Sequence, residues 1–219
     1  MHWNDLGIAV SLYNEIGNVF PSTPLDHYER GYTETISSPT PDSIVLFLNS
    51  WGKMRRHFDA RLIREAMMKA EGSLLALATY SFENAPLENI RNNIILAFDT
   101  IQMGAGSPVA ASKTLHVLKP DLFVPWDNAI ERAYGCGDDS DPQKVKTWGE
   151  TYSVFLNRVQ KVLLRVIRSY AEEHGHQNIL NAASELRGRL YIDGKKPFAK
   201  IIDEYNFMKF TKGKDLLWV

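Results

Sequence analysis

The chain has 219 residues, of which 44% are hydrophobic and 23% charged, the composition of an ordinary globular protein. A chain of this length buries enough apolar surface to fold without disulfides or structural metals. The single cysteine, Cys136, excludes a disulfide framework, a four-cysteine zinc site and a cysteine-ligated iron–sulfur cluster, and it favours a reducing compartment. We therefore expect a protein without a metal or cofactor.

The amino-terminal segment lacks the positive charge and apolar run of a secretory signal, and apolar runs such as 44–48 are too short to span a bilayer. These features predict a soluble, cytoplasmic protein with no membrane contact. The net charge of -1 conceals an asymmetry, because residues 1–50 carry a net charge of -5 and residues 143–219 carry +6. The basic carboxyl-terminal third favours an anionic partner, although solvated lysines would give the same composition.

From residue 42 onward the apolar residues recur with a period near 3.6, and no stretch shows the alternation of a strand. This pattern predicts an all-α protein folded as a single domain over residues 1–219. Residues 17–41 are rich in Pro, Ser, Thr and Gly, which predicts a long loop. The first predicted helix begins at Asp42 or Ser43, and the next three cover 59–70, 73–80 and 86–98. One helix then follows Ser107 and another begins at Asp127. The longest runs from Asp141-Pro142 to His174, and the last two cover 177–187 and 197–207.

Four basic residues share one face of the longest predicted helix. Arg158, Lys161, Arg165 and Arg168 recur at steps of three, four and three residues, and we call them the basic stripe. Such a face can neutralise the phosphates of DNA, and this predicts four DNA-binding residues. The alternative is an ordinary solvated helix face.

Residues 101–135 form the most informative stretch. Gly104-Ala105-Gly106 predicts a tight turn, Ser107 a helix cap and Pro108 the first residue of the next helix. The chain then continues to Asp127, where another helix is predicted to begin. The predicted order is therefore a helix, a Gly-x-Gly turn, a second helix, and an aspartate at the start of a third helix.

This order resembles the helix-hairpin-helix DNA glycosylase superfamily over residues 103–135. The resemblance implies a glycosylase-like fold in which Gly104, Gly106 and Ser107 present backbone amides to a DNA phosphate. It also implies that Asp127 lies beside an extruded nucleotide and assists the attack of water on the sugar. Trp126, which precedes Asp127, is expected to stack on the base in the base pocket.

Two departures from the family pattern limit what the resemblance implies. Pro108 occupies the position of the family's nucleophilic lysine, and Lys113 follows five residues later. The hydrophobic–proline opening of the hairpin is also missing before Gly104. The expected activity is therefore that of a monofunctional N-glycosylase, in which water attacks the sugar.

Other interpretations stay open at this point. The chain could be a nucleic-acid-binding or partner-binding helical protein that keeps the fold without the chemistry, or it could act on free nucleosides. Asp127 could simply cap its helix, and Gly104 and Gly106 could simply end one helix before the next.

Overall fold

The computed structural model describes residues 1–19, 36–50, 57–136, 147–190 and 196–214. All regular secondary structure in these ranges is helical, which confirms the prediction of an all-α protein. Within the same ranges, no single helix is long and apolar enough to cross a membrane.

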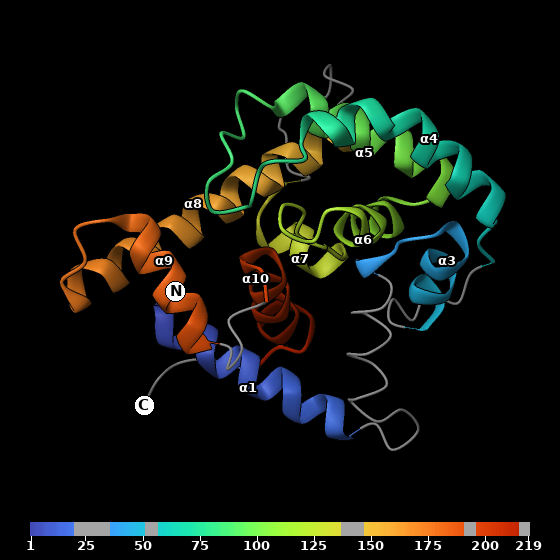
Figure 1. Ribbon diagram of the computed structural model, residues 1–219. Coiled ribbons are helices and arrows are strands. Elements are labelled where there is room, and N and C mark those ends of the chain that lie inside the picture. Colours follow the sequence, from blue (N-terminus) through green and yellow to red (C-terminus); the bar gives the residue numbers. More distant parts are fainter. Residues whose placement is uncertain (20–35, 51–56, 137–146, 191–195, 215–219) are drawn as a thin grey trace.

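Figure 1 shows the helices, coloured in the order of the sequence. The first five are α1 (Trp3–Val19), α3 (Pro41–Ser50), α4 (Ala60–Ala76), α5 (Arg91–Ala105) and α6 (Pro108–Leu118). The remaining elements are α7 (Asn128–Ala133), α8 (Trp148–His174), α9 (Ile179–Leu190), α10 (Phe198–Asn206) and a π-helical turn, η1 (Phe207–Thr211).

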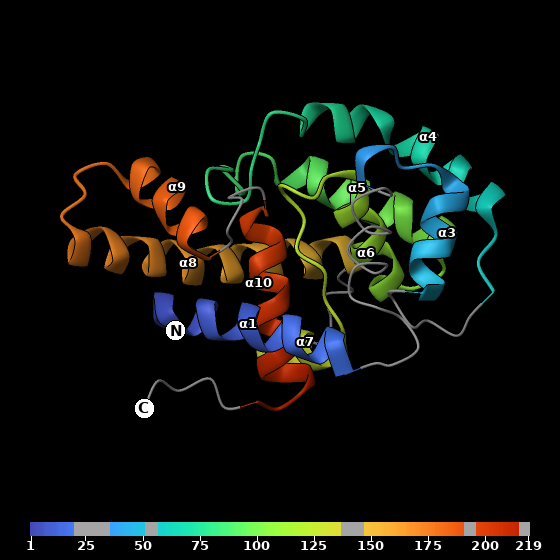
Figure 2. The ribbon, with the colours of Figure 1, turned by 60° about the horizontal axis from the view of Figure 1, so that its bottom comes forward.

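Helix α8 connects two groups of helices, as Figures 1 and 2 show from two sides. Its 27 residues span about 40 Å at the α-helical rise per residue. Toward its amino-terminal end it packs against α5, which also contacts α4 and α6. Toward its other end α8 contacts α9 and α1, and α1 in turn packs on α10. The short helix α7 contacts η1, so the segment that begins with Asp127 meets the end of the described chain.

The main hydrophobic core collects side chains from both groups. Phe98 of α5, Tyr152 and Phe155 of α8, and Trp126 are fully or almost fully buried and contact one another through their rings. Each such side chain contributes about 2 kcal/mol of hydrophobic stabilisation. A second, smaller cluster, which includes Ile44 and Val117, joins α3 to α4 and α6.

Gly104 allows α5 to approach α4 closely. A Cβ atom placed on Gly104 would lie 2.6 Å from the Leu62 carbonyl oxygen and 2.6 Å from the Ala66 Cβ, both on α4. These distances are shorter than non-bonded contacts allow, so only glycine fits here without moving the helices apart. The structure thus gives Gly104 a packing role inside α5, whereas Gly106 forms the turn.

The substitutions Gly104→Ala and Gly72→Ala are expected to change stability in opposite directions. The new methyl group at residue 104 would overpack the α4–α5 interface and lower the free energy of unfolding by about 2 kcal/mol. Gly72 lies in α4 with no atom within 4 Å of a Cβ, so alanine there should raise the free energy of unfolding by about 0.5–1 kcal/mol. Urea unfolding of both variants provides the measurement, and a neutral Gly104→Ala would contradict the packing role.

Two predicted helix boundaries were wrong, and a third lies outside the described residues. The segments 59–70 and 73–80 form one helix, α4, because the exposed Gly72 does not interrupt it. Helix α5 begins at Arg91 instead of Pro86, and the segment before it forms turns, in which the carbonyls of Phe82 and Ala85 accept hydrogen bonds from the Gln160 amide of α8 at 2.7 and 2.8 Å. Helix α8 has its amino-terminal cap at Thr147, and the predicted start at Asp141-Pro142 lies outside the described residues.

The region before residue 42 also differs from the prediction. Helix α1, which was not predicted, extends to Val19 and therefore into the segment expected to be a loop. Of the remaining loop, residues 20–35 lie outside the described part of the chain. The other predicted helices, including α6 after Ser107 and the end of α8 at His174, are confirmed.

Candidate functional site

The connection between α5 and α6 is a hairpin with the local chemistry expected from its residues. Gly106 adopts the left-handed conformation, with φ 70° and ψ 0°, and its amide donates to the Gln102 carbonyl at 2.8 Å. Ser107 is extended, and its hydroxyl accepts a hydrogen bond from the Ala110 amide at 3.1 Å. Pro108 then occupies the first turn of α6, and the two helices are bent by 115° at this break.

The tip of this hairpin offers polar backbone groups to a ligand. The amides of Ser107 and Val109 have no hydrogen-bond partner among the described residues. Gly106 is exposed, and a Cβ placed on it would meet no atom within 4 Å. Amides at the amino-terminal end of a helix carry partial positive charge, so this tip suits an anion such as a phosphate.

Trp126 ties the hairpin to the start of α7. Its indole Nε1 donates to the Pro108 carbonyl at 3.2 Å, and its backbone amide donates to the Ser112 hydroxyl at 3.2 Å. The ring is 2% exposed and packs among core aromatic side chains, so it has no face on which a base could stack. The structure therefore moves Trp126 from the expected base pocket into the core, where it positions Asp127.

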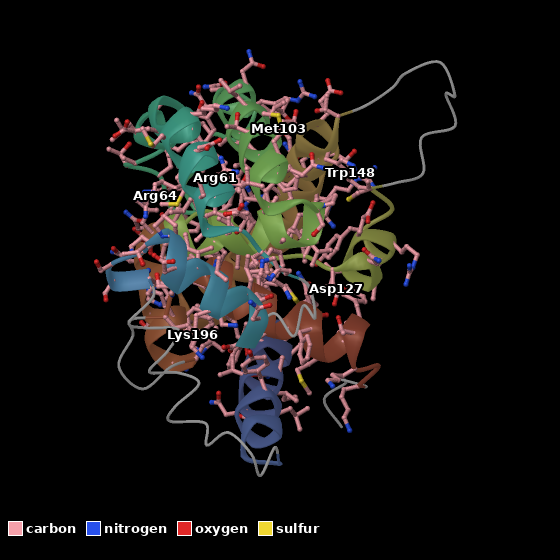
Figure 3. The ribbon with its side chains drawn as sticks, turned by 90° about the vertical axis from the view of Figure 1, so that its right-hand side faces the viewer. Arg61, Arg64, Met103, Asp127, Trp148 and Lys196 are labelled. Carbon is pink, nitrogen blue, oxygen red and sulfur yellow. The ribbon has the colours of Figure 1, made fainter. Side chains whose placement is uncertain are left out.

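Asp127 is the amino-terminal cap of α7. Its Oδ1 accepts hydrogen bonds from the amides of Ala129 and Ile130 at 2.8 and 2.9 Å. Its Oδ2 accepts a hydrogen bond at 2.6 Å from the hydroxyl of Thr211, an exposed residue at the end of η1. The half-buried carboxylate, labelled in Figure 3, thus has one oxygen bonded to its own helix and the other bonded to an exposed residue.

Charged side chains on and just before α10 are buried, and the charges of Lys200 and Asp203 act on residues of α6. Lys200 Nζ lies 2.7 Å from Asp203 Oδ2, and Lys196 Nζ lies 2.8 Å from Glu204 Oε1, all four with at most a tenth of the side chain exposed. Burial lowers the pKa of the Lys113 ammonium on α6, while the nearby carboxylates of Asp203 and Asp127 act in the opposite direction. We call these residues, together with His116, the polar seam: Lys113, His116, Lys196, Lys200, Asp203 and Glu204.

The residues of the polar seam were not identified from the sequence as a site. Asp203 and Glu204 lie on a helix whose apolar period is regular, and nothing in the local pattern indicates that their carboxylates are buried. The pairing of each carboxylate with a lysine one turn or two turns away was the available signal, but such pairs are usually solvated.

His116 is fully buried and is predicted to make the stability of the fold depend on pH. Its Nδ1 donates to the Phe123 carbonyl at 2.7 Å. Burial lowers its pKa from 6.5 to about 4, with a smaller opposing contribution from Asp203 and a further lowering by Lys200. Between pH 6.5 and 4 the imidazole of His116 therefore binds a proton in the unfolded chain but not in the folded chain. The contribution of His116 to stability falls as the pH drops through this range.

Over this pH range the free energy of unfolding should fall by about 3 kcal/mol because of His116, at about 1.4 kcal/mol per pH unit. His116→Gln keeps a donor for the Phe123 carbonyl but does not titrate. Urea unfolding at a series of pH values should show a shallower acid-side decline for this variant than for the original chain. Parallel curves would contradict the prediction, because the carboxylates contribute equally to both.

The basic stripe lies on the exposed face of α8, as its spacing predicts. The Arg158 guanidinium donates to the carbonyls of Tyr134 and Gly135, and so it closes the carboxyl-terminal end of α7. Lys161, Arg165 and Arg168 have no ion-pair partner among the described residues. The structure thus gives Arg158 a structural contact and leaves the other three cations facing solvent.

A cavity of about 450 Å³ lies elsewhere, between α1 and α9, and contains none of the predicted site residues. In the described ranges, no group of three or more His, Cys, Asp or Glu side chains is arranged to hold a metal ion. No family model, curated protein or solved structure matches the chain.

Proposed function

We propose that the chain binds DNA through the α5–α6 hairpin and hydrolyses an N-glycosidic bond at Asp127. The observation that supports this proposal is the tie made by Trp126, because the residue before Asp127 is hydrogen-bonded to Pro108 and Ser112 in the first turns of α6. The hairpin and the carboxylate, which would hold a phosphate and a sugar, are therefore joined through a single residue.

The binding part of the proposal rests on backbone amides. The amides of Ser107 and Val109 are unpartnered among the described residues and lie at a helix amino terminus. A DNA phosphate accepts from such groups without regard to sequence. The exposed cations of the basic stripe would add salt-dependent attraction for the same backbone.

The chemical part of the proposal rests on the two oxygens of Asp127. Oδ1 is fixed by the helix, whereas Oδ2 is bonded to the exposed Thr211 hydroxyl, which a sugar or a water molecule can replace. As the bond from C1′ to the base breaks, the base leaves with the electron pair and the sugar becomes positively charged. The carboxylate stabilises this charge and orients a water molecule, whose oxygen bonds to C1′ while its proton passes to solvent, and the departing base takes up a proton from solvent.

A second function has a specific observation in its favour. Both oxygens of Asp127 already accept hydrogen bonds, as they would in an aspartate that only caps a helix. This arrangement favours a DNA-binding protein with the same hairpin and no hydrolysis. The two functions differ in base release and not in binding.

The substitutions Gly106→Asp and Gly106→Asn form a matched pair that tests the hairpin. Both residues tolerate the left-handed conformation, and there is open space for either side chain. Only Asp places a negative charge where the phosphate is proposed, so it should weaken binding to a short DNA duplex by about tenfold, while Asn should change it little. Fluorescence anisotropy at low salt is the measurement, and equal affinities of the two variants would remove the hairpin from the interface.

A screen for base release, by cleavage at the resulting abasic sites on duplexes carrying damaged bases, tests the activity separately. Release from at least one lesion is expected. Binding without release from any lesion would select the non-catalytic function, and release from free nucleosides alone would point to a nucleoside N-glycosidase.

A further inference from the structure

The segment that leads into Asp127 is buried although it belongs to no helix. Residues 122–126 are all buried, and residues 123–127 have no regular secondary structure. Residues 124–126 make no backbone–backbone hydrogen bond with another described residue. A buried backbone needs partners for its amides and carbonyls, because each unpartnered group costs about as much as a lost hydrogen bond. Other groups must therefore bond to this segment.

Side chains of two helices supply these partners. The His116 imidazole on α6 donates to the Phe123 carbonyl at 2.7 Å, and the Tyr152 hydroxyl on α8 donates to the Val124 carbonyl at 2.8 Å. Residue 125 is a proline, which has no amide to satisfy. The path of this segment is thus set by side chains of α6 and α8.

Ser112 makes the contact of this kind that is closest to Asp127. Its side chain is fully buried in α6. Its hydroxyl accepts a hydrogen bond from the Trp126 amide at 3.2 Å and donates to the Val109 carbonyl, one turn earlier in α6, at 2.9 Å. The Trp126 carbonyl lies 3.5 Å from the same hydroxyl. One buried hydroxyl therefore connects the first turns of α6 to the residue before Asp127.

We infer that Ser112 is a positioning residue for the hydrolysis proposed at Asp127. This inference rests on the proposed function and adds to it a residue that is fully buried and so touches neither DNA nor sugar. Fixing the backbone of Trp126 fixes where the next residue begins, and hence where the Asp127 carboxylate lies. A displacement of a reacting group by about 1 Å can cost about a hundredfold in rate.

The test compares variants that lose one buried hydroxyl each. Ser112→Ala leaves the Trp126 amide without its partner. Single-turnover base release should fall about tenfold, while the dissociation constant for the duplex should stay within about twofold, since the hairpin tip is unchanged. Ser112→Thr keeps a hydroxyl and should restore most of the rate. Tyr152→Phe, the matched control, acts two residues further from Asp127 and should lower the thermal transition similarly but the rate much less.

A second measurement does not need base release. The Ala129 and Ile130 amides donate to Asp127 Oδ1, so their protection from hydrogen exchange reports how well the carboxylate is placed. Ser112→Ala should lower this protection about tenfold relative to that of the α4 amides. Tyr152→Phe should leave the ratio unchanged.

The outcomes separate this inference from the proposed function. If the chain releases bases, a rate loss in Ser112→Ala no greater than in Tyr152→Phe overturns the inference and leaves the function standing. If it releases none, the hydrolytic function fails by itself, and an unchanged exchange ratio at Ala129 and Ile130 overturns the inference as well. Both comparisons use Ser112→Ala and Tyr152→Phe, so they hold even if Ser112→Thr does not fold.

Discussion

Asp127→Asn is expected to lower base release by at least a hundredfold while the chain remains folded. Asparagine keeps an oxygen that can accept from the Ala129 and Ile130 amides, so the cap of α7 survives. It lacks the negative charge that would stabilise the positive sugar, and loss of one such electrostatic contribution costs about 100–1,000-fold in rate. Base release under single-turnover conditions, with the thermal transition as the measure of folding, provides the comparison.

Two controls separate the charge of Asp127 from its cap. Asp127→Ala removes both and should also lower stability by about 1 kcal/mol. Thr211→Val removes the hydroxyl that donates to Oδ2 and should leave base release largely intact, since the proposed step replaces that hydrogen bond. If Asp127→Asn released bases at the original rate, Asp127 would be a helix cap and the hydrolytic assignment would fail.

Lys200→Met is expected to lower the free energy of unfolding by about 3–5 kcal/mol, because it leaves the buried Asp203 carboxylate without its cation. Lys200 lies 2.7 Å from Asp203 and 3.8 Å from Glu204, and its ammonium also lies over the Tyr13 ring at 4.7 Å. A loss of this size is a large part of the total stability of an ordinary domain. Urea unfolding at neutral pH is the measurement.

A double variant distinguishes the cost of an unpaired charge from the worth of the ion pair itself. Lys200→Met with Asp203→Leu removes both charges and replaces them with apolar side chains of similar volume. Most of the lost stability should return, since a buried ion pair often contributes no more than a well-packed apolar pair. If the double variant loses as much free energy of unfolding as the two single variants together, the polar seam stabilises the fold through more than this pair.

The elements predicted correctly from the sequence are those that local chemistry decides. Three consecutive residues define the α5–α6 hairpin: Gly106 adopts a positive φ, Ser107 caps the next helix, and Pro108 is its first residue. The same rules identified Asp127 as the residue at which α7 begins. These groups satisfy one another over a few residues, so no distant part of the chain is needed to predict them.

The predictions that failed depend on distant contacts. The segment before α5 forms turns, and the carbonyls of Phe82 and Ala85 in it accept hydrogen bonds from the Gln160 amide on another helix. Trp126 and Trp148 are equally aromatic in the sequence, and only the tertiary packing makes one a core residue and leaves the other exposed. The burial of Lys200 and Asp203 likewise follows from the packing of α10 on α1, which no local pattern records.

The short helix α7 is fastened at both of its ends. At its start, the Trp126 amide donates a hydrogen bond to Ser112 of α6. At its end, the Arg158 guanidinium of α8 donates to the carbonyls of Tyr134 and Gly135. Under the proposed function, a six-residue segment restrained at both ends would not move toward a bound DNA, so the deformation on binding would fall on the DNA. Duplexes that already bend or open easily should therefore associate faster than stiff ones of equal charge.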